Sequence, residues 1–230
     1  MVLFSKKIKF NALFFGEKRI ICKKRSTYLT LNYCFMKKFL LCFSLLMICI
    51  VGINAQVVTI EKMPESVDEF VAMRDKIADT PEGGATMFII ALKLYNDVPE
   101  IGEQCLVIVA DRSRLVQGTT YKGFSLTKTD MNSINRQLGQ YPYVVNSYFK
   151  GVSPENGYTH RFPTQIDFSS NAYSGSKEEG NFKVFVKCYG ADNSRPIRTI
   201  RNDKGIWKAS EWSSIIMGIR PPVKKIDDDL

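Results

Sequence analysis

Apolar residues recur at helical spacing from residue 64 onward and predict a run of helices. Val67, Phe70 and Ile77 fall on one helical face. Ser66 comes directly before this stretch and Glu69 lies in its first turn, so the two residues match a capping box. In such a box a hydroxyl and a carboxylate accept hydrogen bonds from free backbone N–H groups at the helix start. The pair Thr80-Pro81 places a capping hydroxyl before a first-turn proline, and therefore predicts that a second helix begins there.

Two further helices are expected before residue 140. A third apolar stretch begins at Pro99, and its continuation over residues 105–110 is β-branched enough to suit a buried strand as well. We favour a helix because the periodic stretch runs for about a dozen residues. A fourth stretch begins near Thr127 and ends near Gly139. The helical part is thus expected to occupy about residues 64–140.

The period changes to two after Pro142. Apolar residues alternate with polar ones around Ile166 and Phe168, and again over residues 182–188, with a hairpin loop expected at 174–181. A further strand is expected over residues 196–201, followed by a turn at 202–205 and a return strand that begins near Trp207. The sequence therefore predicts an α+β fold, with about four N-terminal helices packed on one face of a C-terminal antiparallel sheet that spans about residues 162–220.

The positive charge of the chain is concentrated near its start. The 230 residues carry 32 Lys and Arg against 23 Asp and Glu, a formal net charge of +9. Ten of these basic residues and one acidic residue lie within residues 1–55, which leaves 22 of each sign in the rest. A neutral remainder has no net field to attract phosphate backbones, so we expect no nucleic-acid partner.

The segment 36–55 has the pattern of a secretory signal peptide. Lys37 and Lys38 precede an uncharged apolar stretch, and small Ala55 offers a cleavage site that would make Gln56 the new N-terminus. The apolar stretch is shorter than the roughly 20 residues that span a bilayer, so membrane association is expected only before cleavage. Residues 1–35 read as a gene-model extension or a disordered leader. Residues 56–230 are then a single exported domain, periplasmic or extracellular and not cytoplasmic.

Residue types that carry common chemistries are scarce. His160 is the single histidine, so multi-histidine metal sites and a histidine-based triad have no support. We expect no catalytic residue, no metal and no cofactor. After removal of the leader, Cys105 and Cys188 are the two remaining cysteines. Export into an oxidising compartment permits a disulfide between them, and the alternative is two separately buried thiols.

The most informative feature is a mixture of aromatic and polar residues after the helices. Tyr and Trp combine a flat apolar face with a polar group, which suits sugars, peptides or protein partners, although it also suits a sheet core. We predict that five residues contact a ligand: Tyr148, Asn156, Tyr158, Arg195 and Trp207. The planar guanidinium of Arg195 would donate hydrogen bonds to a carboxylate or to sugar hydroxyls.

Several segments together resemble a known family. They include Pro154-Glu155-Asn156-Gly157-Tyr158 and the run from Arg201 through Gly205-Ile206-Trp207-Lys208 to Ser214. The chain resembles a family of exported gut-bacterial proteins, from Bacteroidetes and Firmicutes, known only as a domain of unknown function. The likeness covers about residues 61–230. It implies an exported domain and supplies no activity.

We therefore expect a non-enzymatic module that binds an unknown glycan, peptide or protein ligand through an aromatic-rich surface. One alternative is a carboxylate-based hydrolase of a cell-surface polymer, because carboxylate chemistry needs no histidine. The carboxylates available for it are those of Asp111, Asp130, Asp167, Asp192 and Glu211. The other alternative is a structural envelope-associated module, which a large flat apolar patch would indicate.

Overall fold

The helices begin where the sequence predicts. In a computed structural model, which describes residues 55–224, the α-helices are α2 (Val67–Ile77), α3 (Pro81–Asp97), α4 (Pro99–Val109) and α5 (Lys128–Gln140). Ser66 Oγ accepts a hydrogen bond from Glu69 N at 3.2 Å, and Thr80 Oγ1 accepts one from Gly83 N at 3.1 Å. The Glu69 carboxylate caps Glu65 N rather than Ser66 N. The helix expected from Pro99 is confirmed over the strand alternative.

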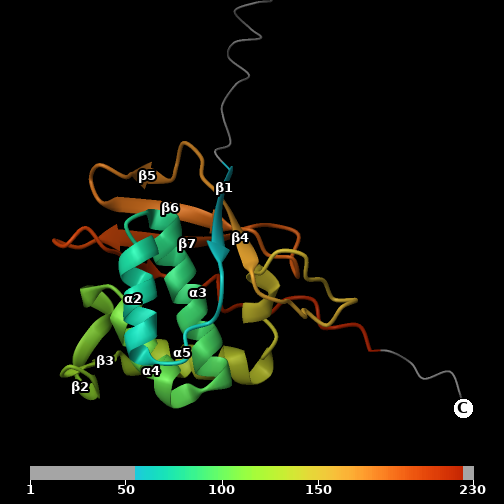
Figure 1. Ribbon diagram of the computed structural model, residues 1–230, viewed down its shortest axis with the longest axis horizontal. Helices are drawn as coiled ribbons and strands as arrows, with labels where there is room; N and C mark the ends of the chain where they lie inside the picture. Colours follow the sequence, from blue (N-terminus) through green and yellow to red (C-terminus); the bar gives the residue numbers. More distant parts are fainter. Residues whose placement is uncertain (1–54, 225–230) are drawn as a thin grey trace, which may run out of the picture. The chain divides into compact units, whose positions relative to one another are not determined.

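Helix α3 is the central element of the described residues. It is buried over most of its length and contacts α2, α4 and strands β1, β6, β7 and β8. Figure 1 shows α2 and α3 side by side in front of the sheet strands. Gly84 permits the close approach of α3 to the sheet, because a Cβ atom there would lie 2.6 Å from the carbonyl oxygen of Trp207. The glycines of this first turn thus serve packing.

An antiparallel sheet forms the second layer. Its strands lie in the order β1-β4-β6-β7-β8, and short β5 pairs with β6. Their bounds are β1 (Ala55–Ile60), β4 (Thr164–Ser169), β5 (Gly175–Ser176), β6 (Asn181–Val186), β7 (Arg195–Arg201) and β8 (Trp207–Glu211). The expected turn after β7 is confirmed, since Asn202 Oδ1 accepts hydrogen bonds from the backbone of Lys204 and Ile206. Strand β1 is an element that the sequence pattern did not predict.

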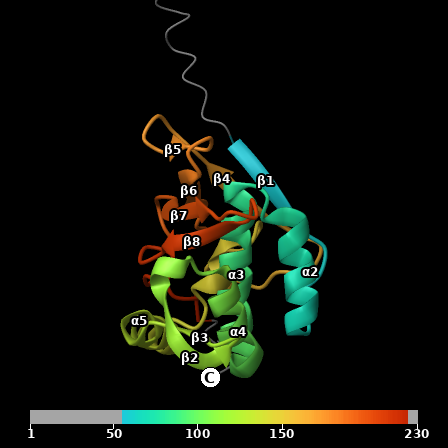
Figure 2. The same cartoon turned by 90° about the vertical axis from the view of Figure 1, so that its left-hand side faces the viewer.

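A separate hairpin also escaped the sequence pattern. Strands β2 (Leu115–Tyr121) and β3 (Phe124–Leu126) pair with each other and pack against α4 (Figure 2). The two residues between them, Lys122 and Gly123, both have positive φ, at 47° and 85°. Such values are typical of the type I′ turn that suits a two-residue hairpin loop. The hairpin is separate from the main sheet, and Lys122 lies in the turn at its tip.

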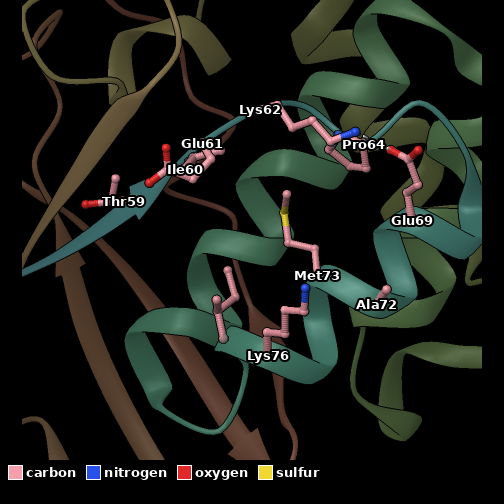
Figure 3. Close-up of a pocket in the computed structure, with 10 residues that line it drawn as sticks. Thr59, Ile60, Glu61, Lys62, Pro64, Glu69, Ala72, Met73 and Lys76 are labelled. Carbon is pink, nitrogen blue, oxygen red and sulfur yellow. Dashed lines mark hydrogen bonds and ion pairs between the residues drawn. The ribbon is translucent and has the colours of Figure 1, made fainter.

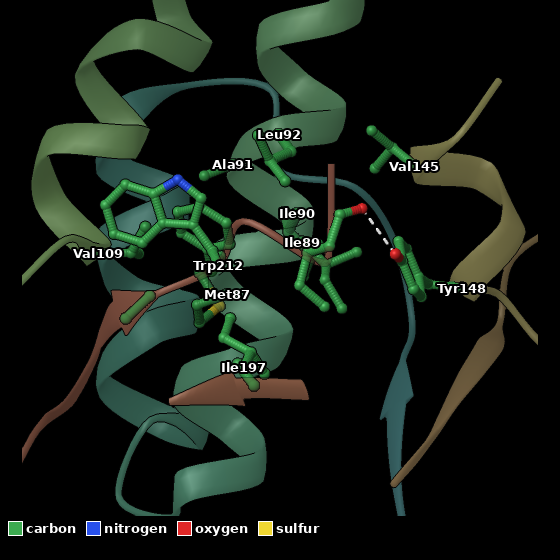
Figure 4. Close-up of a cluster of buried hydrophobic side chains, with 14 of the residues drawn as sticks. Met87, Ile89, Ile90, Ala91, Leu92, Val109, Val145, Tyr148, Ile197 and Trp212 are labelled. Atoms are coloured by element: carbon green, nitrogen blue, oxygen red, sulfur yellow. Dashed lines mark hydrogen bonds between the residues drawn. The ribbon is translucent and has the colours of Figure 1, made fainter. Parts of the chain in front are cut away.

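The core joins both layers. Phe88 of α3 packs on Trp212 with ring centroids 4.7 Å apart, and Tyr148 lies fully buried on the opposite side of α3 (Figure 4). The Tyr148 hydroxyl donates to the carbonyl oxygen of Ile215 at 2.6 Å. Residues 212–215, which read as part of a strand in the sequence, instead form turns that bury Trp212 and Ile215.

The α+β class is confirmed, and the helices are mostly N-terminal. The finer expectation, that the helices all lie on one face of the sheet, stays a prediction. The predicted extension 1–35 lies outside the described residues, and so does the predicted signal peptide 36–55 apart from Ala55. The last six residues of the predicted exported domain, 225–230, also lie outside them. Within residues 55–224, no helix is both long enough and apolar enough to cross a bilayer.

Candidate functional site

A pocket of about 470 Å³ lies where α2, α4, the β2–β3 hairpin and the β7–β8 turn meet. We call it the basic pocket, because five of its lining side chains are cationic and none is acidic. Its lining residues are Val71, Arg74, Val107, Ile108, Arg112, Leu115, Tyr121, Lys122, Phe124, Lys204 and Lys208. Small-molecule sites commonly have volumes of roughly 300–1,000 Å³, so the pocket has the size of a ligand site.

The apolar wall of the basic pocket comes from the helices. Val107 and Ile108 in the last turns of α4 are 3% exposed, and half-buried Val71 faces the same space from α2. Leu115 extends this wall at the start of β2. Half-buried Val71 and Leu115 therefore supply the accessible apolar surface for a hydrocarbon or sugar ring, and buried Val107 and Ile108 support it.

Two cations of the pocket lie on aromatic rings of the hairpin. The guanidinium carbon of Arg112 is 4.4 Å from the ring centroid of Phe124, and Arg112 Nη1 donates to the carbonyl oxygen of Leu115 at 3.0 Å. Lys122 Nζ is 5.2 Å from the ring centroid of Tyr121. Neither Arg112 nor Lys122 forms an ion pair with an acid among the described residues. Both charges remain available to an incoming anion.

The other three cations, Arg74, Lys204 and Lys208, form what we call the three-cation cluster. Arg74 is half-buried, and its Nε and Nη2 donate to Asp75 at 2.9 and 2.6 Å. Burial and the positive charges of Arg74 and Lys204 lower the pKa of Lys208, while Asp111 acts in the opposite direction. Within residues 55–224 neither lysine pairs with a carboxylate. Holding positive charge in this cluster therefore costs free energy, and a bound anion would reduce that cost.

A second hollow, the β1–α2 groove, differs in its charge. It has a volume of about 410 Å³ and an apolar floor, into which Met73 projects from α2 (Figure 3). Its charged residues are Glu61, Lys62, Glu69 and Lys76, two of each sign. Lys62 Nζ lies 3.3 Å from Glu69 Oε2, and hydrogen bonds from Glu65 N and from Lys62 lower the pKa of Glu69. The groove is electrically balanced and partly paired within itself.

Three of the predicted ligand residues belong to the core. Tyr148 and Tyr158 are fully buried, and Trp207 is 3% exposed. The Tyr158 hydroxyl donates to the carbonyl oxygen of Arg220 at 2.6 Å, and its ring stacks on Tyr143 with centroids 5.8 Å apart. A ligand could reach none of these three rings unless the core opened. Their aromatic character therefore serves packing in the described fold.

The other two predicted ligand residues serve backbone groups. Arg195 is half-buried and donates to the carbonyl oxygens of Ser214, Met217 and Gly218 at 2.8, 3.4 and 3.0 Å. Asn156 is exposed, and its side-chain oxygen accepts from Ser153 N at 2.9 Å. Tyr148, Tyr158 and Arg195 thus all donate to carbonyls of residues 214–220. We call this arrangement the C-terminal clasp.

The two cysteines of the described residues, Cys105 and Cys188, are free and buried. The structure therefore has two separate thiols in place of the disulfide. Cys188 Sγ lies 3.3 Å from Ser147 Oγ, and burial raises the pKa of Cys105 to about 12.

The residues at the predicted cleavage site lie at the start of β1. Ala55 is the first residue of that strand, and Gln56 pairs with Phe168 of β4. When its amide nitrogen faces α3, Gln56 donates to both carboxylate oxygens of Glu82. Glu82 is 4% exposed and accepts from Lys177 Nζ at 3.1 and 3.3 Å. Cleavage after Ala55 stays a prediction.

The carboxylates considered for hydrolysis each have a local partner. Asp130 pairs with Arg114, Asp167 with Lys150 and Tyr189, Asp192 with Arg220, Glu211 with Arg198, and Asp111 accepts from Ser113. None of them lines the basic pocket or the β1–α2 groove. The two acids that line the groove, Glu61 and Glu69, are exposed. Within residues 55–224, no group of three or more His, Cys, Asp or Glu residues is placed to hold a metal ion.

The basic pocket leaves almost no trace in the sequence pattern. Its five cations are spread from residue 74 to residue 208, and they come together only through the fold. The one local signal is the hairpin segment Tyr121-Lys122-Gly123-Phe124, where a basic residue lies between aromatic ones beside a glycine turn.

Comparisons with known proteins give a family and no activity. No curated protein and no solved structure matches the chain. Residues 62–223 match the family described as "Domain of unknown function (DUF6935)", so the match covers the described residues almost from end to end. The chain therefore belongs to the DUF6935 family, whose function is unknown.

Proposed function

We propose that this protein is an exported, non-enzymatic binding module that holds a small anionic ligand with an apolar portion in the basic pocket. One observation carries the proposal: five cationic side chains and no acidic one line a single hollow of about 470 Å³. Half-buried Lys208 forms no ion pair with a carboxylate of the described residues, and a ligand carboxylate, sulfate or phosphate would supply one.

The shape of the pocket defines the rest of the ligand. The apolar surface of half-buried Val71 and Leu115 suits a hydrocarbon chain or the flat face of a sugar ring. The rings of Tyr121 and Phe124 add a second apolar side beneath Lys122 and Arg112. The expected glycan, peptide or protein ligand is thereby narrowed to molecules that present an acidic group beside an apolar one. The pocket is too small to hold a nucleic-acid duplex.

The sequence pattern of residues 36–55 supports export, and the start of the fold is compatible with cleavage after Ala55. Residues 1–35 are proposed to be an extension outside the functional protein. The domain is proposed to act in the periplasm or outside the cell, as its resemblance to exported gut-bacterial proteins implies. The helices are proposed to lie together on one face of the sheet, which leaves the edge formed by α2, α4 and the hairpin open to ligand.

The hydrolase alternative draws no support from the carboxylates, because each has a local partner outside the basic pocket. The structural-module alternative calls for a large flat apolar patch. The exposed large apolar residues of the described chain, such as Val57, Val116 and Tyr173, come from separate elements.

Calorimetric titration with three octyl compounds tests the proposal. Octyl sulfate and octanoate carry a negative charge, and octyl glucoside has the same chain without one. We expect the two anions to bind and the glucoside not to bind. The double variant Arg112→Ala/Lys122→Ala should weaken anion binding about tenfold or more, because charge-assisted contacts are lost.

The matched control is Lys62→Ala/Lys76→Ala in the β1–α2 groove, which removes the same charge from the other hollow. It should leave affinity unchanged. Absence of binding by every anion, or an equal loss in both double variants, would rule the basic pocket out as the ligand site.

A further inference from the structure

We infer that the three-cation cluster of Arg74, Lys204 and Lys208 is the subsite for the charged end of the ligand, and that it selects a doubly charged phosphate monoester over a singly charged acid. This inference rests on the proposed function, since it assigns a headgroup to the same pocket. It goes further because it names the chemical class and the side chains that choose it.

The three cations come from different elements that the fold holds together. Arg74 is in α2, Lys204 is in the β7–β8 turn, and Lys208 is in β8. The backbone N–H of Trp207 donates to the carbonyl oxygen of Ala78 at 2.8 Å, which ties the start of β8 to the end of α2. Asn202 Oδ1 accepts from Lys204 N at 3.0 Å and fixes the turn. The backbone positions from which the three cationic side chains extend are therefore held by the fold itself.

The charge balance of the pocket favours a dianion. Two acids are placed to offset the five cations: Asp75, which pairs with Arg74, and Asp111, which acts on Lys208. Three positive charges remain in excess. A carboxylate or a sulfate monoester would leave two of them uncompensated, whereas a dianionic phosphate leaves one. Because the cluster is half-buried at Arg74 and Lys208, this difference is screened less than at an open surface.

The geometry of the donors also suits a phosphate. Asp75 occupies Nε and Nη2 of Arg74, so Nη1 has no hydrogen-bond partner among the described residues. Lys204 of the β7–β8 turn and Lys208 of β8 line the same pocket with their side chains. Three donor groups from three elements can serve the three terminal oxygens of a phosphate monoester, whereas a flat carboxylate offers only two oxygens.

Lys208 makes the binding depend on pH. Its neighbours from each adjoining element are Arg74 of α2, Lys204 of the turn and Asp111, which follows α4. Burial and the two cations lower its pKa, and a bound dianion would raise it again. Affinity should therefore fall as pH rises through the lowered pKa, and binding near that pKa should take up a proton. Phosphate monoesters lose their second proton near pH 6, so the dianion is present above that value.

The experiment compares octyl phosphate with octyl sulfate by calorimetric titration of the full chain at pH 7.5. We expect octyl phosphate to bind at least about tenfold more tightly. Lys208→Met keeps the length and apolar stem of the side chain, and Arg74→Gln keeps a donor. Each variant should reduce octyl phosphate affinity about tenfold or more and octyl sulfate affinity less, so that the preference shrinks. Lys62→Gln in the β1–α2 groove is the control and should change neither affinity.

Titration in two buffers of different ionisation enthalpy, at pH values from 7.5 to 10, measures proton uptake. Uptake should be present in the parent protein and absent from Lys208→Met, a result that a merely structural role for Lys208 would not give. The inference is overturned if octyl phosphate and octyl sulfate bind equally and both cluster variants weaken them equally, although the proposed function would stand. If neither compound binds the parent protein, the proposed function itself fails.

Discussion

The C-terminal clasp and the basic pocket use similar residue types in opposite ways. In the clasp, Arg195 and the hydroxyls of Tyr148 and Tyr158 donate to backbone carbonyls, so their hydrogen-bonding capacity is met within the protein. In the basic pocket, Lys122 and Lys208 form no ion pair with a carboxylate of the described residues. The contrast shows that aromatic density marks packing here, whereas uncompensated charge marks the candidate site.

The largest expected effect that separates the two regions is on stability. Tyr148→Ala should lower the free energy of unfolding by about 3–5 kcal/mol, because it removes a fully buried ring and leaves the Ile215 carbonyl without its donor. Tyr148→Phe should cost only about 1 kcal/mol through the lost hydrogen bond. Urea denaturation measures both. Unchanged stability with lost ligand binding would return Tyr148 to the role of a ligand contact.

A smaller effect is expected for the arginine pair Arg195 and Arg112. Arg195→Ala leaves the carbonyls of Ser214 and Gly218 unpaired and should cost about 1.5–3 kcal/mol without changing octyl sulfate affinity. Arg112→Ala should cost about 0.5 kcal/mol or less and weaken the same ligand, since Arg112 is exposed. Denaturation and titration of both variants complete the comparison. Equal losses of stability and equal losses of octyl sulfate affinity in the two variants would contradict the contrast between the clasp and the basic pocket.

The next effect is the response of the empty pocket to pH. Lys208→Met should stabilise the protein slightly near pH 7, because burial and neighbouring cations oppose the charge of Lys208. With a lowered pKa, the folded protein holds this proton less tightly than the unfolded chain does. The stability of the parent protein should therefore rise, relative to the variant, as pH increases from the lowered pKa toward the ordinary value of 10.5. Melting curves at several pH values measure the gap, and a constant gap would contradict the prediction.

The smallest effect concerns the two thiols. Cys105 and Cys188 should resist alkylation in the native protein, because both are buried and burial raises the pKa of Cys105 to about 12. Peptide mapping after brief alkylation, with a denatured sample as the positive control, measures each position. A labelled Cys105 in the native sample would show that the core near α4 opens. A peptide pair linked through sulfur would show that the disulfide forms after all.

Much of the fold could be predicted from local signals. The capping hydroxyls of Ser66 and Thr80 and the turn at Asn202 are local chemistry, and each lies where it was expected. Strand β1 was missed because its six residues are mostly exposed, which gives no alternation to read. The turns after Trp212 were mistaken for a strand because short apolar runs look alike whether they pack as strands or as turns.

The candidate site could not be predicted, for a physical reason. A formally neutral domain predicts no nucleic-acid partner, but net charge says nothing about where individual charges gather within the fold. Arg74 and Lys208 are 134 positions apart in the sequence and become neighbours only when β8 docks beside α2. Conversely, Tyr148 and Trp207 look adaptable in the sequence, and only their burial reveals that the core uses them.

The contact between Gln56 and Glu82 bears on maturation. If the proposed peptidase cuts after Ala55, it releases an α-ammonium group on the residue whose amide already reaches the Glu82 carboxylate. Precursor and processed forms would then differ by a positive charge on the residue whose side chain shares buried Glu82 with Lys177. The same cut would remove Ala55 from its pairing with Ser169, so the processed strand would begin at the residue whose side chain reaches Glu82.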